Sequence, residues 1–472
     1  MDFINENSTD QRQLFNAVNS LLSEHNEKAL PPYTCAISLA NDFGTNVSRT
    51  DSDDFSSSTF KGTPFSKFNN IPLASVQKLV TSGPSKSCAS DPLPTSIAKQ
   101  CVDELSPATS SIINLSLESG EFPEEWKGRF QQVVIDDSTS DKFNIDFGVP
   151  QGSCLGPLLF SIYTTPLLDI VSNHLPTVHC YADDTQLAFQ PDDTAAQESA
   201  VASMEACIKD FRNLMTKDSL KINDDKTEVI LIGTKAQFKK VKIDNLAVGD
   251  YKIVPSTEAI KNLGCWFDNN FTMNAQVTKT CKAGFFYLHN ICRIRKFLTQ
   301  EITEKLIHAF VTSRLDYCNS LLYGLPSNLL AKLQRVQNAA ARLIHRAPRF
   351  CHITPLLVDL HWLDIKSRID FKIILLTFKA IHGQAPAYIC ELVNLKPNSS
   401  YGLRSNNKML LSTLNFRTLP TLGDCAFAAA APKLWNAIPL SIRQEQNLEH
   451  LNKKLKTYLF LCNYKSIFID VM

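Results

Sequence analysis

The chain has almost no net charge and no clustered cysteines. Its 472 residues hold 48 Lys and Arg against 47 Asp and Glu, so charge summed over the whole chain does not indicate a nucleic-acid partner. None of the fourteen cysteines lies in a CxxC pair, and the closest two are Cys281 and Cys292, which argues against zinc fingers and zinc knuckles. Scattered cysteines without a signal peptide predict an intracellular protein, in the nucleus, the cytoplasm or both.

Long hydrophobic runs are also missing. The longest stretch, from Phe371 to Ile381, contains Lys372 and Lys379 and is too short to cross a bilayer. We therefore expect no membrane partner. The apolar and charged fractions are those of a globular protein, and the length predicts two to four domains.

The charge that is present is unevenly distributed. Residues 1–59 hold nine acids against three bases, whereas residues 279–349 hold twelve Lys and Arg against three acids. A basic block inside a neutral chain indicates a localised anionic partner.

Two adjacent aspartates, Asp183 and Asp184, stand between two short strand-like runs within residues 177–189. One interpretation is an ordinary hairpin turn, in which Asp is common. The other is a divalent metal site, because Mg²⁺ prefers one or two carboxylates together with substrate phosphates. Adjacent side chains in a straight strand point to opposite faces, so both carboxylates can serve one metal site only at a tight turn.

Two further segments become informative when they are considered together with this aspartate pair. The loop Gly148–Ser153 leads into a helix and allows close backbone approach to a phosphate, although a plain connecting loop has the same composition. Lys226 precedes an apolar run and could reach a phosphate, although most such lysines are simply solvated.

In this order, Gly148–Ser153, Tyr181–Asp184 and Asn223–Glu228 resemble the last three palm motifs of reverse transcriptases. The resemblance is closest to the polymerases of non-LTR, LINE-like and jockey-like retrotransposons. It extends over nearly all of residues 71–460 through blocks similar to the primer grip, the thumb and the C-terminal segment of that family: Ile260–Phe267, Arg314–Asn319, Leu333–Ala340, Gly423–Ala430, Trp435 and Pro439–Leu440.

The resemblance implies RNA-directed DNA polymerase activity, with an RNA template, a DNA primer and deoxynucleotides as partners. Asp183 and Asp184 would hold Mg²⁺ or Mn²⁺ for two-metal nucleotidyl transfer. Lys226 would act on the leaving pyrophosphate. The remaining implied positions are Gln151, Gly152, Ser153, Tyr181 and Ala182 for nucleotide and template, and Leu263, Gly264 and Trp266 for the primer end.

A basic helix is expected over residues 329–346. At 100° per residue, Lys332, Arg335, Arg342 and Arg346 fall within an arc of about 80°, next to an apolar stripe. The shortage of acids nearby favours a surface that follows a nucleic-acid backbone over an ordinary solvated face. His345, Cys351, His352 and His361 fit no common zinc spacing, and we expect structural roles for them.

One part of the family's pattern is missing. Reverse transcriptases have an earlier strand with an Asp that bridges both metals, preceded by a fingers region. Here the segment that resembles the start of the polymerase runs directly into the following hairpin at Lys127 and Gly128. Asp136 and Asp137 lie in a hairpin loop where a turn role is natural. We therefore expect an internally truncated and strongly impaired polymerase, because losing one member of a catalytic group costs orders of magnitude in rate.

The expected fold is α+β: a polymerase palm that lacks its fingers and first catalytic strand, followed by an all-α thumb and a C-terminal helical region. Within it, the pattern predicts helices over about residues 95–105, 107–118 and 194–219, strands over 129–135, 142–147, 229–232 and 241–254, and helices from Asn274 onward with breaks near Pro326, Pro348, Pro355 and Gly383. The expected division is residues 1–70 as a partly disordered linker remnant, 71–127 as the helical start of the polymerase, 128–272 as palm, 273–350 as basic thumb and 351–472 as C-terminal region. Two alternatives stay open. The chain could be a non-catalytic nucleic-acid-binding remnant that uses the basic thumb, or an artificial union of two segments of an intact element.

Overall fold

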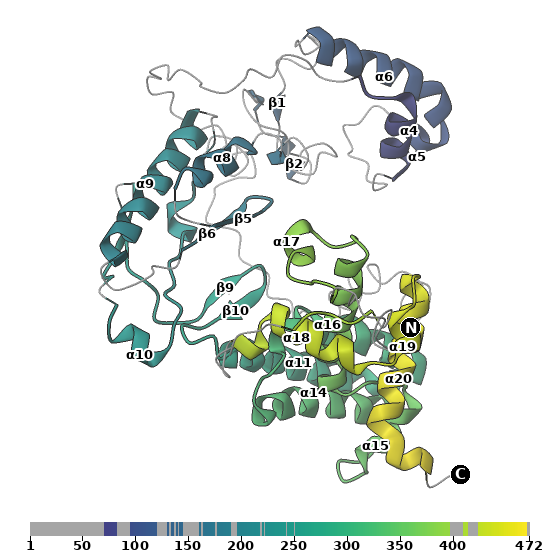
Figure 1. The fold of residues 1–472 in the computed structure, drawn as a ribbon. Coiled ribbons are helices and arrows are strands. Elements are labelled where there is room, and N and C mark those ends of the chain that lie inside the picture. The colour runs from purple at the N-terminus through teal and green to yellow at the C-terminus, as the bar shows by residue number, and fades with distance from the viewer. Residues whose placement is uncertain are drawn as a thin grey trace, which may run out of the picture. The chain divides into compact units, whose positions relative to one another are not determined.

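The computed structural model describes residues 70–82, 95–119, 130–131, 134–135, 138–139, 141–144, 160–161, 164–174, 177–189, 196–217, 220, 222–241, 243–249, 251–396, 409–413 and 423–469. These residues are mostly helical, with small antiparallel hairpins (Figure 1). The expected combination of helices and strands is therefore present. The predicted N-terminal linker, residues 1–70, lies outside the described residues except for its last position.

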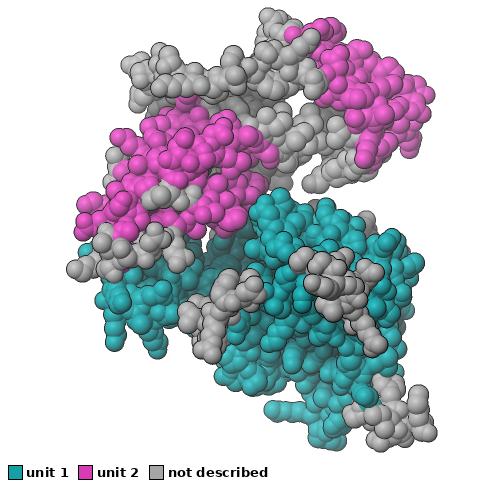
Figure 2. Space-filling model, viewed as in Figure 1, with its two compact units in different colours: residues 1–27, 228–244, 254–472 teal, residues 28–227, 245–253 magenta. Residues whose placement is uncertain are grey.

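The chain divides into two compact units, which Figure 2 colours separately. One unit comprises Met1–Glu27, Glu228–Asp244 and Val254–Met472, and we call it the helical unit. The other comprises Lys28–Thr227 and Asn245–Ile253, and we call it the hairpin unit. Each is described by itself.

The first described helices of the hairpin unit form a small packed group, in which α4 contacts α6. Asn114 links α6 to Ile71, two residues before α4, because its side-chain amide accepts from Ile71 N at 2.7 Å and donates to Ile71 O at 3.1 Å. A helix break was expected near Pro107, but α6 continues through it. The three helices are α4 (Leu73–Ser82), α5 (Thr95–Gln100) and α6 (Val102–Ser119).

Short strand pairs and two helices follow in the same unit. β1 pairs with β4 and β2 with β3, as expected for a hairpin in this region. The long helix expected over residues 194–219 is α9, and its buried face contacts α8 and β7. The elements are β1 (Phe130–Gln131), β2 (Val134–Ile135), β3 (Ser138–Thr139), β4 (Phe143–Asn144), α8 (Pro166–Ser172), β5 (Thr177–Tyr181), β6 (Asp184–Ala188), α9 (Ala196–Lys217) and η2 (Asp224–Lys226).

Residues 241–254 do not form the strand that the sequence predicted. They form a hairpin of β7 (Leu246–Val248) and β8 (Tyr251–Ile253), with Gly249 at a φ of +63° in its turn. An ideal Cβ on Gly249 would lie 2.7 Å from the guanidinium carbon of Arg212, so a larger residue would have to displace that guanidinium as well as adopt a positive φ. The strand expected over residues 229–232 is reduced to an isolated bridge between Ile230 and Ser256.

The helical unit begins with α10 (Lys235–Phe238) and the hairpin of β9 (Ile260–Asn262) and β10 (Cys265–Phe267). Helices then follow to the end of the described chain, as the sequence predicted from Asn274 onward. Pro355 was expected to break a helix but lies inside α15 near its start. The elements up to α15 are α11 (Asn274–Ile294), η3 (Arg295–Phe297), α12 (Gln300–Ile307), the π-helical turn η4 (His308–Thr312), α13 (Ser313–Asp316), η5 (Asn319–Leu322), α14 (Ser327–His345) and α15 (Ile353–Asp359).

Two apolar clusters hold these helices together. The larger joins α11 to α14 with α12, η4 and the first half of α16, and it includes the fully buried Phe310 and Ile344. The smaller joins the second half of α16 to α18 and α20 around Phe378 and Trp435, and Trp435 Nε1 donates to Met409 O at 2.8 Å. The remaining elements are α16 (Ile365–Ile381), α17 (Ala387–Cys390), η6 (Gly423–Cys425), α18 (Phe427–Ala437), α19 (Leu440–Arg443) and α20 (Leu448–Ile469).

Across the described part of the chain, none of the helices combines the length and hydrophobicity needed to span a membrane.

Candidate functional site

The aspartate pair lies on a tight hairpin in the hairpin unit. β5 and β6 pair from Thr177 with Ala188 to Tyr181 with Asp184, so Ala182 and Asp183 are the two turn residues. Asp183 therefore lies at the tip, and Asp184 is the first residue of the returning strand. The two strands that the sequence predicted around the pair are confirmed, and the turn between them lets the two carboxylates escape the strict alternation of a strand.

The turn is formed without glycine. Ala182 adopts a φ of 53°, in the left-handed region that non-glycine residues seldom occupy. Two-residue hairpin turns require positive φ at the first central position, and Ala182 supplies it at a cost of about 1–2 kcal/mol. Tyr181, directly before it, has 68% of its surface exposed. The hairpin therefore presents an aromatic ring and two carboxylates at one strained tip.

Both carboxylates are exposed, and within the described residues neither has an ion pair or hydrogen bond. Two adjacent carboxylates open to solvent are hard oxygen ligands of the kind that Mg²⁺ binds through one or two protein groups. In the described ranges, no cluster of three or more His, Cys, Asp or Glu side chains is placed to hold a metal ion. Two carboxylates alone would leave most ligand positions of such a cation to water and substrate.

Lys226 lies on a separate turn that is fixed to α9. It ends η2, the short 3₁₀ turn whose first residue, Asp224, forms a bidentate ion pair with Arg212 of α9. The Lys226 side chain is exposed. Gln151, Gly152 and Ser153, the other positions expected to serve nucleotide and template, lie outside the described residues.

The expected primer-end residues lie on the β9–β10 hairpin of the helical unit. Leu263 and Gly264 are its two turn residues, with φ values of 44° and 83°, as a type I′ hairpin turn requires. Tyr317 closes over the turn, donating from its hydroxyl to Leu263 O at 2.6 Å. An ideal Cβ on Gly264 would lie 3.1 Å from Cε1 of Tyr317, so a side chain at position 264 would require the Tyr317 ring to shift.

The third expected primer residue, Trp266, is fixed by α11. Its backbone N–H donates to Gln276 Oε1 at 3.0 Å, and Lys279 Nζ lies 4.8 Å from the centroid of its ring. Burial raises the pKa of the neighbouring Cys265 thiol to about 12, with a further contribution from a hydrogen bond with Cys318. In β10, the Cys265 thiol is therefore buried and neutral, while the Trp266 ring is partly exposed beside the Lys279 ammonium group.

The four basic residues predicted on one stripe of α14 have two kinds of surroundings. Lys332 and Arg335 are exposed, and in the described part of the chain neither is engaged in an ion pair or hydrogen bond. Arg342 Nη2 instead donates to Cys351 O, and Arg346 Nη2 donates to Arg295 O and Leu298 O, each at 3.3 Å. Two of the four basic side chains therefore already donate to backbone carbonyls near the end of the helix.

A second basic face lies on α11, and the sequence reasoning did not single it out. At 100° per residue its exposed members occupy an arc of about 80°. Burial raises the pKa of the Cys281 thiol of α11, and the charges of Lys332 and Arg335 oppose that shift, which places α14's free cations near this helix. The members of this face are Lys279, Lys282, Phe286, His289 and Arg293. Their spacing of 3, 4, 3 and 4 residues would have revealed the face from the sequence.

Comparison with known proteins gives one family match. Residues 107–267 match the family described as Reverse transcriptase (RNA-dependent DNA polymerase). This range contains the aspartate hairpin, Lys226 and the β9–β10 hairpin, and it ends before α11.

Two curated relatives support the match. The chain is 25% identical over 253 residues to the "Probable RNA-directed DNA polymerase from transposon X-element" of Drosophila melanogaster, covering 52% of this chain. It is 25% identical over 248 residues to the "RNA-directed DNA polymerase from mobile element jockey" of Drosophila funebris, covering 50% of this chain. The matched part spans 26% of the length of each relative.

Proposed function

We propose, from the premise that residues 107–267 are a reverse transcriptase region similar to those of the jockey and X elements, that this chain is an RNA-directed DNA polymerase whose metal ligands are Asp183 and Asp184. The observation that supports this most directly is the β5–β6 tip, where two exposed carboxylates, without partners among the residues that the structure describes, lie inside the matched region. The turn itself does not account for Asp184, which is the first residue of β6 and not a turn residue.

Asp183 and Asp184 would hold Mg²⁺ or Mn²⁺. When bound, the metal ions neutralise developing charge and activate the primer 3′-oxygen for attack. The chain's own contribution is to hold two hard oxygen ligands on a strained, solvent-facing turn, next to the exposed ring of Tyr181.

The remaining roles follow from the same family pattern. Lys226 is exposed on a turn that Arg212 fixes to α9, which suits a cation that must meet a leaving pyrophosphate without being neutralised by the protein. Leu263, Gly264 and Trp266 would seat the DNA primer end on the β9–β10 hairpin. Gln151, Gly152 and Ser153, with Tyr181 and Ala182, would position the deoxynucleotide and the RNA template.

We also propose that the activity is weak. Two-metal transfer relies on a further carboxylate that bridges the ions, and between Lys127 and Gly128 the sequence lacks the strand that supplies it in the family. Loss of one member of such a group removes most of the rate. Within this proposal residues 71–127 start the polymerase, 128–272 form the palm, 273–350 the thumb and 351–472 a C-terminal helical region.

Primer extension on a primed RNA template tests both statements. We expect slow extension with Mg²⁺ or Mn²⁺ that disappears in Asp183→Asn and in Asp184→Asn. Asp169→Asn is the matched control, because Asp169 is an exposed acid of α8 in the same unit, and it should leave extension unchanged. Extension that survives both substitutions would refute the metal assignment. A wild-type rate of roughly 1 s⁻¹ or more, ordinary for enzymes, would refute the impairment.

The second candidate function is non-catalytic nucleic-acid binding by the helical unit. Lys332 and Arg335 of α14, together with the basic face of α11 and its exposed Phe286, combine phosphate-binding cations with a ring on which a base can stack. Arg342 and Arg346 would contribute less, because their guanidinium groups also donate to carbonyls.

Salt dependence of RNA binding tests this surface separately from catalysis. Each phosphate-binding cation that is removed should lower the slope of log affinity against log salt by about 1, so Lys332→Gln with Arg335→Gln should lower it by about 2. The control pair, Lys235→Gln at the start of α10 with Lys239→Gln directly after it, removes two exposed lysines from the same unit. Equal slopes for the two double variants would exclude the α14 surface.

A further inference from the structure

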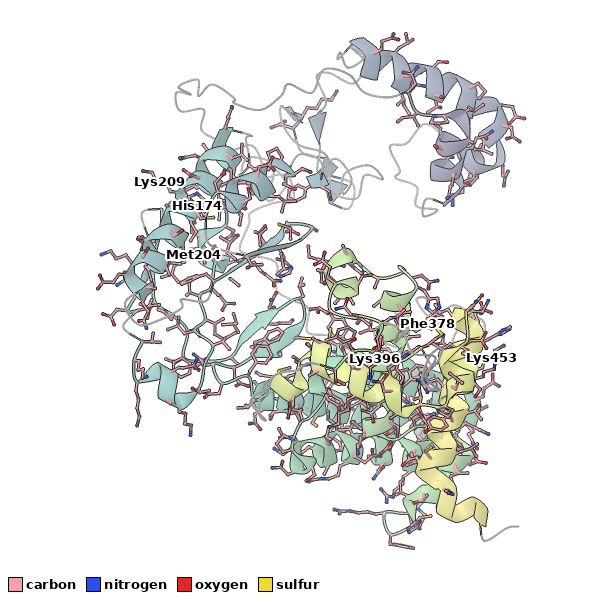
Figure 3. The ribbon with its side chains drawn as sticks, in the orientation of Figure 1. His174, Met204, Lys209, Phe378, Lys396 and Lys453 are labelled. Atoms are coloured by element: carbon pink, nitrogen blue, oxygen red, sulfur yellow. The ribbon has the colours of Figure 1, made fainter. Side chains whose placement is uncertain are left out.

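Two segments that are far apart in the chain meet at the β9–β10 hairpin of the helical unit, whose side chains Figure 3 draws as sticks. Tyr317, directly after α13, donates from its hydroxyl to Leu263 O at 2.6 Å. Beside this contact two thiols meet, because Cys318 is hydrogen-bonded to Cys265 of β10. Both cysteines are free thiols, so the hairpin and the segment after α13 bring an unbonded thiol pair together.

The neighbours of both cysteines are anchored. Cys265 lies in a paired strand, and the backbone N–H of the next residue, Trp266, donates to a side chain of α11. On the other segment, two residues before Cys318, the carboxylate of Asp316 is bound by Arg368 Nε at 2.8 Å. The two sulfur atoms are therefore held near each other, and bond formation only has to bring them to about 2.05 Å.

The two thiols differ in their access to solvent. Cys265 is only 3% exposed, and burial raises the pKa of its thiol to about 12, so this thiol stays protonated. Cys318 is partly exposed and is therefore the thiol that a small oxidant meets first. An accessible thiol beside a shielded one is the arrangement of a reacting cysteine and a resolving cysteine.

We propose that Cys265 and Cys318 form a reversible disulfide when the chain meets hydrogen peroxide. The Cys318 thiol attacks one peroxide oxygen, which gives a sulfenic acid at Cys318 and one molecule of water. The Cys265 sulfur then attacks the sulfenic sulfur, the S–S bond forms, and the hydroxyl group leaves with the Cys265 proton as a second water. The two thiols lose two electrons, and the peroxide gains them. The second step is the slower one, because the nucleophile is the thiolate and Cys265 is protonated.

The disulfide would join the β9–β10 hairpin to the segment between α13 and η5 and close a loop that contains α11 and α12. A link between residues this far apart restricts the unfolded chain, so the oxidised protein should be harder to unfold. It would also hold the turn at Leu263 and Gly264 against Tyr317. The inference is independent of the polymerase assignment, because it uses no metal ligand and no nucleic acid.

Peptide mapping of the oxidised full chain tests the proposal. The folded protein is treated with hydrogen peroxide, the remaining thiols are blocked with N-ethylmaleimide in guanidinium chloride, and the chain is digested with trypsin without reduction. Cleavage after Lys and Arg places each of the two cysteines in a peptide with no other cysteine, residues 262–279 for Cys265 and 315–332 for Cys318. We expect mass spectrometry to find these two peptides joined and dithiothreitol to separate them.

Two comparisons distinguish a positioned pair from random oxidation. A chain that is unfolded in guanidinium chloride before the peroxide is added should yield the joined peptides several-fold less, because unfolding separates the two segments. Cys292→Ser is the matched control: Cys292 is an exposed cysteine of α11 in the same unit, and its loss should leave the joined peptides unchanged.

Urea unfolding gives an independent readout of the same bond. Oxidation should raise the urea midpoint of the wild type and of Cys292→Ser, dithiothreitol should reverse the rise, and Cys318→Ser should show none. Three results would overturn the proposal: oxidation of Cys318 while Cys265 stays open to the maleimide, equal yields of joined peptides from folded and unfolded chains, or the same midpoint shift in the wild type and in Cys318→Ser.

Discussion

Replacing Gly264 by alanine tests why the β9–β10 hairpin has its observed turn. Gly264 has a φ of +83°, and an added Cβ would lie 3.1 Å from Cε1 of Tyr317 and 3.2 Å from its hydroxyl oxygen. The left-handed backbone costs alanine about 1–2 kcal/mol, and the smaller entropy of the unfolded alanine chain returns about 0.4–1 kcal/mol. Backbone strain alone therefore predicts a loss of about 1 kcal/mol.

Tyr317 adds to that loss. The new methyl group must push the ring aside, which weakens the 2.6 Å hydrogen bond from Tyr317 to Leu263 O, worth about 0.5–1.5 kcal/mol. We therefore expect Gly264→Ala to destabilise the protein by about 1.5–2.5 kcal/mol. Urea unfolding followed by tryptophan fluorescence measures this loss as a lower midpoint.

Gly383 provides the matched control. It also has positive φ, +64°, at the end of α16, but no atom lies within 4 Å of its ideal Cβ. Gly383→Ala should therefore cost only about 1 kcal/mol. In a Tyr317→Ala background, Gly264→Ala should likewise fall to about 1 kcal/mol. If Gly264→Ala costs no more than Gly383→Ala in the wild-type background, the packing argument is wrong.

Three further predictions concern buried charge and backbone strain. Burial raises the pKa of the Asp370 carboxyl from its ordinary 3.8 to about 6. Because the folded state holds this proton more tightly than the unfolded state, the carboxyl lowers the free energy of unfolding increasingly as pH rises from about 4 to 6. Asp370→Asn should therefore raise the free energy of unfolding at pH 8 by about 1–2 kcal/mol, with little gain at pH 4.5. Arg295→Met should cost about 3–5 kcal/mol in urea unfolding, because the buried guanidinium donates to Leu343 O, Leu298 O and Ile344 O at 2.6–2.9 Å. Ala182→Gly should relieve the strained turn and raise the melting temperature slightly, and a fall would contradict the cost assigned to its φ of 53°.

Local patterns predicted those parts of the fold that depend on neighbours along the chain. The alternation around Asp183 and Asp184 predicted the β5–β6 hairpin, and the helical periodicity predicted α9, α11 and α14. The same reasoning failed for residues 241–254, where an apparent strand is a hairpin. Its turn depends on Gly249 and on the side chain of Arg212, which comes from a distant helix and could not be placed from sequence.

The basic helix α14 likewise has one feature that the sequence predicted and one that it could not predict. The sequence placed Lys332, Arg335, Arg342 and Arg346 on one stripe, and periodicity could not distinguish a free cation from one that donates to a carbonyl. Only the packing of the loops after α11 and α14 decided that Arg342 and Arg346 also bind backbone oxygens. The same periodicity also places Lys279, Lys282, His289 and Arg293 of α11 on one face.

By itself, the sequence determined the order of the chemical groups: a paired carboxylate, a following lysine, a glycine hairpin and then a basic helical region, which together led to the reverse transcriptase family. The tertiary structure alone decided the contacts between residues far apart in the chain. Tyr317 reaches Leu263 across 54 positions and Arg368 reaches Asp316 across 52. A sequence pattern reports neighbours within one strand or one helical turn, whereas burial, crowding and a contact such as that between the Cys265 and Cys318 thiols arise only where separate elements pack together.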